Sequence, residues 1–184
     1  EAASAACMEA IRSRMDGQIA GRTALILCGR GNNGGDGAAL ARAMSRAGMH
    51  CSVVLFGKLA ETTGDARTNF ESVSRLASFE AGSSDAPPPL TFIECAGVAG
   101  WEQLAKPRHA FDVIVDALFG TGLRRPLEGV FLKVIEHLEL LEEARARAGD
   151  SHPLVLSIDI PSGLNADKPE PIGPAVRADV TVTF

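Results

Sequence analysis

The stretch LILCGRGNNGGDG, residues 25–37, decides the fold of this chain. It joins a short apolar run to a glycine-rich segment, and the alanine-rich residues 38–44 that follow are predicted to form a helix. A strand, a glycine loop and a helix in this order are typical of nucleotide and phosphate sites. Glycine permits a tight turn, and the positive end of the helix dipole faces the ligand. We therefore expect residues 29–37 to bind such a ligand.

Two familiar nucleotide-site motifs fit this segment poorly. The spacing Gly29-x-Gly31-x-x-Gly34 matches the dinucleotide-binding pattern, but the next predicted strand, residues 51–57, ends without the acid that would bind a ribose hydroxyl. No Lys-Ser/Thr pair is present, which excludes a P-loop. The Asp36 carboxylate would also repel a pyrophosphate. A purely structural alternative, a tight turn with Asp36 as the helix N-cap, stays open.

The composition is that of one ordinary globular domain. The chain has 184 residues, of which 46% are hydrophobic and 22% charged. Its net charge of −5 argues against nucleic-acid and membrane-surface binding. Four cysteines are scattered singly, which predicts thiols in a reducing compartment, so we expect a cytoplasmic protein. We expect a single domain over residues 1–184, trimmed at both ends or cut from a longer, even bifunctional, chain.

Predicted strands and helices alternate along the chain. The expected strands are residues 24–28, 51–57, 90–94, 111–116, 154–159 and 178–184. The expected helices are residues 2–15, 38–48, 61–76, 101–105 and 129–148. Such alternation predicts an α/β fold, namely a three-layer αβα Rossmann-like domain with a mostly parallel sheet.

Polar residues follow three of the predicted strands, at residues 32–36, at Asp116 and at residues 159–162. Because the ends of parallel strands share one edge of the sheet, these residues should converge near the switch point between the first and fourth strands. Their amide, carboxylate and hydroxyl oxygens suit a hard cation rather than zinc. Arg124 and Arg125 are candidates for phosphate contacts. As structural alternatives, Asp116 caps a turn and the two arginines are a solvated pair.

Three motifs together resemble the NAD(P)H-hydrate epimerase family, the YjeF N-terminal domain. They are GNNGGDG at residues 31–37, DALFGTG at 116–122 and SIDIPSG at 157–163, in the family's order. The resemblance covers residues 2–184 and implies repair of damaged coenzyme. The R and S hydrates of NADH and NADPH, called NADHX and NADPHX, would be interconverted for a fused or separate dehydratase. It also implies a homodimer; no nucleic acid or membrane is expected as a partner.

The resemblance also implies site residues and a cofactor. A potassium ion, K+, is expected at Asn33, Asp116 and Ser162. The implied substrate-binding residues are Asn32, Asn33, Gly34, Gly35, Asp36, Gly120, Thr121, Gly122, Leu123, Arg124, Arg125 and Asp159.

Epimerisation needs an acid that protonates a leaving hydroxyl and a base that deprotonates the returning water. One carboxyl group can do both in turn, and Asp159 first and Asp36 second are the candidates. The alternative is a non-catalytic binding or dimerisation module of the same fold, which would be expected to lose the polar loop residues. One departure from the family is Arg30, which occupies a position where proline is usual.

Overall fold

The computed structural model describes residues 2–81, 89–105, 111–148, 153–168 and 172–183. Six parallel strands form one sheet in the order β3-β2-β1-β4-β5-β6, which confirms the predicted α/β Rossmann-like fold. The elements are α1 (Ala2–Arg14), β1 (Thr23–Cys28), α2 (Asn32–Arg46), β2 (His50–Phe56), the 3₁₀ turn η1 (Leu59–Glu61), α3 (Gly64–Ala81), β3 (Leu90–Cys95), α4 (Gly97–Leu104), β4 (Val113–Ala117), α5 (Gly129–Ala148), β5 (Leu154–Ile158) and β6 (Val180–Val182).

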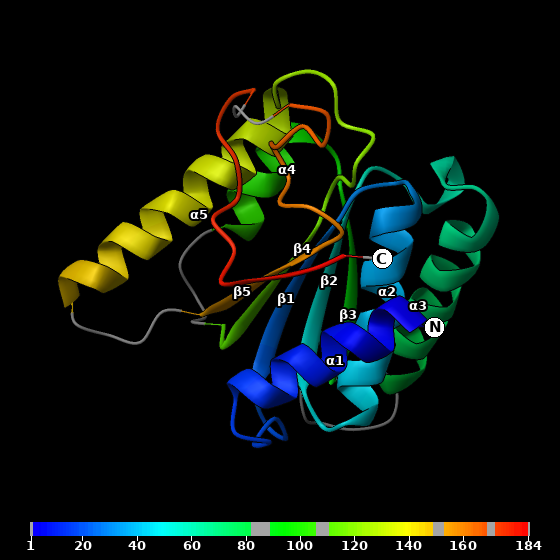
Figure 1. Cartoon of the computed structure of the whole chain (residues 1–184). Helices are drawn as coiled ribbons and strands as arrows, with labels where there is room; N and C mark the ends of the chain where they lie inside the picture. Colours follow the sequence, from blue (N-terminus) through cyan, green and yellow to red (C-terminus); the bar gives the residue numbers. More distant parts are fainter. Residues whose placement is uncertain (1, 82–88, 106–110, 149–152, 169–171, 184) are drawn as a thin grey trace.

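Helices cover both faces of the sheet, with α1, α2 and α3 on one face and α4 and α5 on the other (Figure 1). Successive residues of β1 point to opposite faces, as a strand requires. Ile26 and Cys28 pack beneath α1–α3, whereas Leu27 packs in the cluster that contains Trp101 of α4 and Val134 of α5. Burial on both faces explains why β1 is an unbroken apolar run.

The glycine-rich segment differs from its prediction, because α2 begins at Asn32 rather than at Ala38. Gly31 is the N-cap, so the interpretation of Asp36 as the N-cap is wrong. Glycine is unfavourable inside a helix, but close packing requires it here. A Cβ on Gly37 would lie 2.6 Å from the Cβ of Ala117, and a Cβ on Gly34 would overlap the carbonyl oxygen of Gly29. These two glycines therefore serve close packing rather than a tight turn.

Several other boundaries also differ from prediction. The predicted helix at residues 61–76 is replaced by η1 and then α3, which begins at Gly64 and runs to Ala81. Helix α4 begins at Gly97, a turn earlier than expected, because glycines at 97 and 100 weakened the helical signal. Strand β6 is shorter than predicted. The loop predicted after α3 falls largely on residues 82–88, which lie outside the described residues.

Candidate functional site

Strands β1, β4 and β5 are neighbours, so the three polar segments of the sequence start from one edge of the sheet. Asp116 on β4 pairs with Leu27 of β1 and with Ser157 of β5. Just beyond β1, the amide of Gly29 donates to the carbonyl oxygen of Ala117 at 3.0 Å. The start of α2 thus lies at the β1–β4 switch point, where ligands bind in open α/β sheets.

Asp116 is fully buried and accepts four hydrogen bonds. Its Oδ1 accepts from the Ser162 hydroxyl at 2.6 Å and from the Leu118 amide at 3.3 Å. Its Oδ2 accepts from the Ser157 hydroxyl and from the Ser162 amide, both at 2.8 Å. The Ser162 hydroxyl in turn accepts from the amide of Phe119 at 3.0 Å. This cluster ties the loops after β4 and β5 together. Ser157 and the two loop amides were not predicted, since nothing in their residue types marks them.

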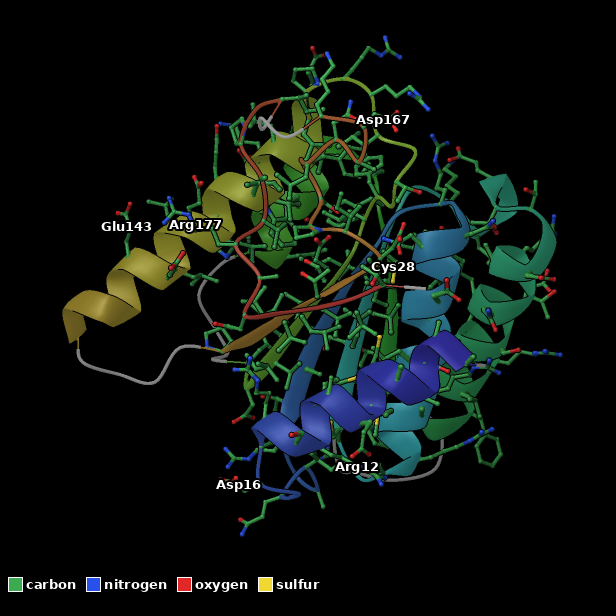
Figure 2. The ribbon with its side chains drawn as sticks, in the orientation of Figure 1. Arg12, Asp16, Cys28, Glu143, Asp167 and Arg177 are labelled. Atoms are coloured by element: carbon green, nitrogen blue, oxygen red, sulfur yellow. The ribbon has the colours of Figure 1, made fainter. Side chains whose placement is uncertain are left out.

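Within the described part of the chain, no basic side chain balances the charge on Asp116. Burial raises the pKa of Asp116 above its ordinary value, and the four hydrogen bonds oppose that rise. Burial, and then the nearby Asp116 carboxylate, also raise the pKa of the Cys28 thiol, which lies inside the fold at the end of β1 (Figure 2). Among the described residues, no lysine, arginine or histidine forms an ion pair with Asp116. Buried charges are normally paired or bind a metal, so this carboxylate suits a nearby cation.

Asp159 lies just beyond β5 in an unusual backbone conformation. Its φ is +70°, a region that residues other than glycine rarely adopt and that often marks functional sites. Its Oδ2 accepts a hydrogen bond of 2.8 Å from the amide of Thr121. A Cβ on Gly120 would collide with that same carboxylate, so any larger residue there would displace the Asp159 side chain. The side chain is half-buried and held in one position at the sheet edge.

Asp36, in the second turn of α2, belongs to the same electrostatic environment. Burial raises its pKa, and the Asp159 carboxylate raises it further. Burial, and then the charge of Asp36, raise the pKa of the Cys7 thiol on α1 to about 11. Helix α1 packs against α2, which was not predicted from the sequence. The available signal was the apolar face of α1, where Cys7 and Ile11 are fully buried.

The first turn of α2 presents polar groups to this edge. Gly31 makes no side-chain cap, and a Cβ on it would meet open space. The first amides of a helix have no acceptor within it, so this turn favours an anion. Asn32 is exposed, whereas Asn33 is partly buried and its amide nitrogen is buried without a hydrogen-bond partner. Gly34 and Gly35 are buried, and the amide of Gly35 already donates to the carbonyl oxygen of Gly31 at 3.0 Å.

The loop at residues 120–125 reaches outward. Thr121 and Gly122 are exposed, while Leu123 packs against a small apolar cluster near α5. Arg124 forms an ion pair with Asp167 at 2.7 Å, and both side chains are more than half exposed. Asp167 was not predicted, and Figure 2 shows it on an outer loop. Both Arg124 and Arg125 are exposed, which agrees with the alternative that they form a solvated pair.

The donor atoms fit a hard, singly charged cation. Asp116 and Ser162 are in direct contact. The unpaired atom of Asn33 is its amide nitrogen, which is a donor, so Asn33 would bind a cation through its oxygen and not through this nitrogen. All three side chains offer oxygen, the ligand that such cations prefer. In the part of the chain that the structure describes, no group of three histidine, cysteine, aspartate or glutamate side chains could hold a metal. The candidate site differs from such a group, because it has one carboxylate, one amide and one hydroxyl and so carries less negative charge than a site with several acidic side chains.

Comparisons with known proteins agree with one another. The family model described as "YjeF-related protein N-terminus" matches residues 1–184. A protein named NAD(P)H-hydrate epimerase from Rhodobacter capsulatus is 35% identical over 190 residues, covering 100% of this chain and 75% of that one. A bifunctional NAD(P)H-hydrate repair enzyme, Nnr, from Thermofilum pendens is 41% identical over 162 residues, 88% of this chain and 26% of that one.

The chain spans only part of the length of several relatives, and its fold matches that of a solved structure. The chain spans 26% and 29% of two bifunctional relatives and 62% of an epimerase from Limosilactobacillus fermentum. The crystal structure of the yeast protein ynu0 superposes with a TM-score of 0.64 at 24% identity, covering 89% of this chain and 58% of that one. That superposition agrees with the three-layer fold.

Proposed function

This chain belongs to the family of YjeF-related protein N-termini, and from that premise we propose that it interconverts the R and S hydrates of NADH and NADPH. The observation that carries the proposal is the pair Asp36 and Asp159: Asp159 is held at the sheet edge by the Thr121 amide, and its carboxylate helps raise the pKa of Asp36 in α2. Relatives named NAD(P)H-hydrate epimerase support it. The polar residues that a non-catalytic module would be expected to lose are all present.

Inversion at the hydroxylated carbon breaks one C–O bond and makes another. A protonated carboxyl group donates its proton to the hydroxyl, which leaves as water. Water then returns on the opposite face, and the carboxylate takes a proton back, so no proton or electron is gained or lost overall. Asp159 is the first candidate because the amide of Thr121 and its own backbone orient it. Asp36 is the second, since its raised pKa favours the protonated acid.

Binding of the dinucleotide would use main-chain and side-chain groups around the same edge. The first turn of α2, with Asn32, Asn33 and the amide of Gly34, suits the phosphates, and Gly35 allows close approach while its amide donates to the carbonyl oxygen of Gly31. The loop of Gly120, Thr121, Gly122, Leu123, Arg124 and Arg125 would cover the substrate near Asp159. For Arg124, this requires breaking an exposed ion pair with Asp167, which costs little.

The proposal includes a potassium ion held by Asn33, Asp116 and Ser162. It would supply a fixed positive charge that offsets the buried Asp116 and the negative charge of the substrate. Replacing potassium by lithium or tetramethylammonium should lower the unfolding midpoint by about 5 °C, since a bound ion stabilises only the folded state. Calorimetric melting in each salt measures this shift. An unchanged midpoint together with an unchanged epimerisation rate would remove the ion from the proposal.

The proposal also includes a dehydratase partner, a homodimer and a location in the cytoplasm. Relatives named as bifunctional repair enzymes support a dehydratase that is fused or separate. A homodimer is expected and can be tested by analytical ultracentrifugation. Among the described residues, no helix has the length and apolar character needed to cross a bilayer. The four cysteines are buried thiols, which supports a reducing compartment such as the cytoplasm.

The direct test is to incubate a purified R hydrate with the protein and follow the S hydrate by chiral chromatography. We expect the mixture to approach equilibrium much faster than without protein. A protein that binds the hydrate but leaves its configuration unchanged would be the binding module instead. Heat-treated protein provides the control for spontaneous epimerisation.

A further inference from the structure

The end of β2 is covered by an arginine from the neighbouring loop. Strand β2 lies beside β1, so residues 29–31 and the turn after Phe56 share one edge of the sheet. The side chain of Arg30 crosses Gly57: its Cδ and Cγ lie 2.5 and 2.9 Å from the position that a Cβ on Gly57 would occupy. Gly57 also has a φ of +137°, which disfavours any other residue. The glycine thus leaves room for the guanidinium stem over the strand end.

Two cations and a carboxylate meet at this position. Arg30 Nη1 donates to Glu61 Oε2 at 3.0 Å, and the amide of Lys58 donates to the same oxygen at 3.3 Å. The Lys58 amide and then the Arg30 guanidinium lower the pKa of Glu61, and the charge of Lys58 acts in the same direction. All three side chains are exposed. Within the described residues, only Glu61 accepts from Arg30, so most of the five guanidinium N–H donors remain available.

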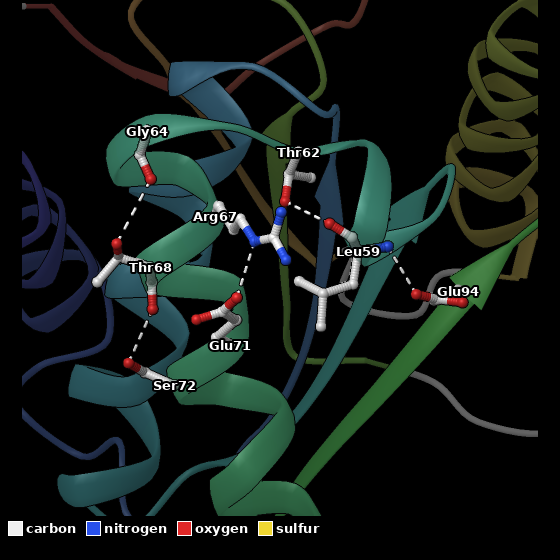
Figure 3. A network of polar contacts seen from close by, with 8 residues as sticks. All are labelled: Leu59, Thr62, Gly64, Arg67, Thr68, Glu71, Ser72 and Glu94. Atoms are coloured by element: carbon white, nitrogen blue, oxygen red, sulfur yellow. Dashed lines mark hydrogen bonds and ion pairs between the residues drawn. The ribbon is translucent and has the colours of Figure 1, made fainter.

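A second acid at this edge is already used by the backbone. The Glu94 carboxylate of β3 accepts a hydrogen bond of 2.6 Å from the amide of Leu59 and so holds η1 in place (Figure 3). The Glu61 carboxylate does lie at the end of β2, where a dinucleotide site for NAD places an acid that binds the ribose hydroxyl: its Oε2 is 3.2 Å from the position of a Cβ on Gly57. That oxygen already accepts hydrogen bonds from Arg30 and from the Lys58 amide. The residues at the end of β2 are Gly57 and Lys58, beside Arg30.

The orientation of the bound dinucleotide along the sheet edge follows from the proposed function, on which this inference rests. The reacting ring would lie beside Asp36 and Asp159, toward β4 and β5, and the pyrophosphate would lie at the first turn of α2. In an open sheet of this order, the other half of a dinucleotide extends toward β2. Its adenosine ribose would then lie beside Arg30 and Lys58. A 2′-phosphate would meet two cations there, whereas the hydroxyl of an unphosphorylated ribose would meet a carboxylate oxygen of Glu61 that already accepts two hydrogen bonds.

We infer that Arg30, assisted by Lys58, recognises the 2′-phosphate of the adenosine ribose, so that the protein prefers the hydrate of NADPH to that of NADH. Glu61 holds the guanidinium in position and competes with the phosphate for it. A guanidinium matches a phosphate with two parallel hydrogen bonds, which gives the contact both strength and selectivity.

The test compares kcat/KM for the two hydrates in wild type and three variants. Arg30→Gln should reduce the NADPHX:NADHX ratio about tenfold, mainly through the KM of NADPHX, because one charge-assisted contact is lost. Glu61→Gln should raise the ratio about threefold, because it frees the guanidinium. Arg67→Gln is the matched control: Arg67 on α3 is equally exposed and pairs with Glu71 at 2.8 Å (Figure 3). It should change neither rate.

A binding measurement separates this inference from the proposed function. Wild type should bind 2′-phospho-ADP-ribose more tightly than ADP-ribose in calorimetry, and Arg30→Gln or Lys58→Gln should reduce that preference. If wild type shows this preference but epimerises neither hydrate, the proposed function fails and the inference stands. If both hydrates are epimerised with equal kcat/KM, or Arg30→Gln lowers both equally, the inference fails and the function stands.

Discussion

Asp116 and Asp159 follow neighbouring strands of one sheet, yet their surroundings differ sharply. Asp116 is fully buried and accepts hydrogen bonds from two hydroxyls and two amides. Asp159 is half-buried, accepts a bond from the amide of Thr121, and has a rare backbone conformation. The difference teaches that a buried carboxylate with four hydrogen-bond donors organises the loops around it, whereas a half-buried carboxylate at the sheet edge can meet a substrate. Asp116 is therefore assigned to the stability of the loops and to the proposed ion, and Asp159 to the chemistry.

The largest expected effect is on catalysis at Asp159. Asp159→Asn should lower kcat for epimerisation by about 10²–10⁴-fold, the usual contribution of a general acid–base group. Its unfolding midpoint should change little, since asparagine tolerates a positive φ. Chiral chromatography and thermal melting measure the two outcomes. A variant with full activity would exclude Asp159 as the acid and leave Asp36 as the candidate.

Asp116 should show the opposite pattern, with stability affected first. Asp116→Ala leaves the amides of Ser162 and Leu118 buried without their acceptor, and should lower the free energy of unfolding by about 3–5 kcal/mol. Urea titration measures this loss. Ser157→Ala, which removes a single donor from the same carboxylate, should cost about 1 kcal/mol. Equal, small losses in both variants would show that the cluster does not hold the loops.

The glycines of α2 provide a smaller and more local comparison. Gly37→Ala should cost about 1–3 kcal/mol, because its Cβ would lie 2.6 Å from the Cβ of Ala117. At Gly31 an added Cβ meets open space, so Gly31→Ala should cost less than about 1 kcal/mol. Urea unfolding of the two variants distinguishes packing from turn formation. If Gly31→Ala proved the more harmful, the glycines would serve the turn after all.

The smallest effect concerns pH and Asp36. Its raised pKa means that folding favours the protonated carboxyl group, so its contribution to stability is complete below about pH 3.9, the ordinary value, and is lost as pH rises through the raised value. Asp36→Asn should remove this part of the decline in unfolding free energy between acidic and neutral pH. Urea titrations across that range measure the slope, with the exposed Asp65→Asn as control. Parallel slopes in wild type and Asp36→Asn would contradict the raised pKa.

The sequence alone determined the fold class and the edge of the sheet where the polar residues gather. Apolar runs alternate with helical patterns, and this order leaves few arrangements other than a doubly wound parallel sheet. Because parallel strands end on the same edge, Asp36, Asp116 and Asp159 could be expected near one another before any coordinates. The three motifs also identified the family correctly.

Only the tertiary structure decided what each of these residues contacts. Glycines occupy positions 34 and 37 inside α2 because Gly29 and Ala117 lie too close for larger side chains, which local propensity does not reveal. Ser162 reaches Asp116 across 46 positions of the chain, and Arg30 reaches Glu61 across 31. The physical reason is that periodicity reports local conformation and burial. Hydrogen bonds and charge pairs depend on which distant segments the folded sheet brings within about 3 Å.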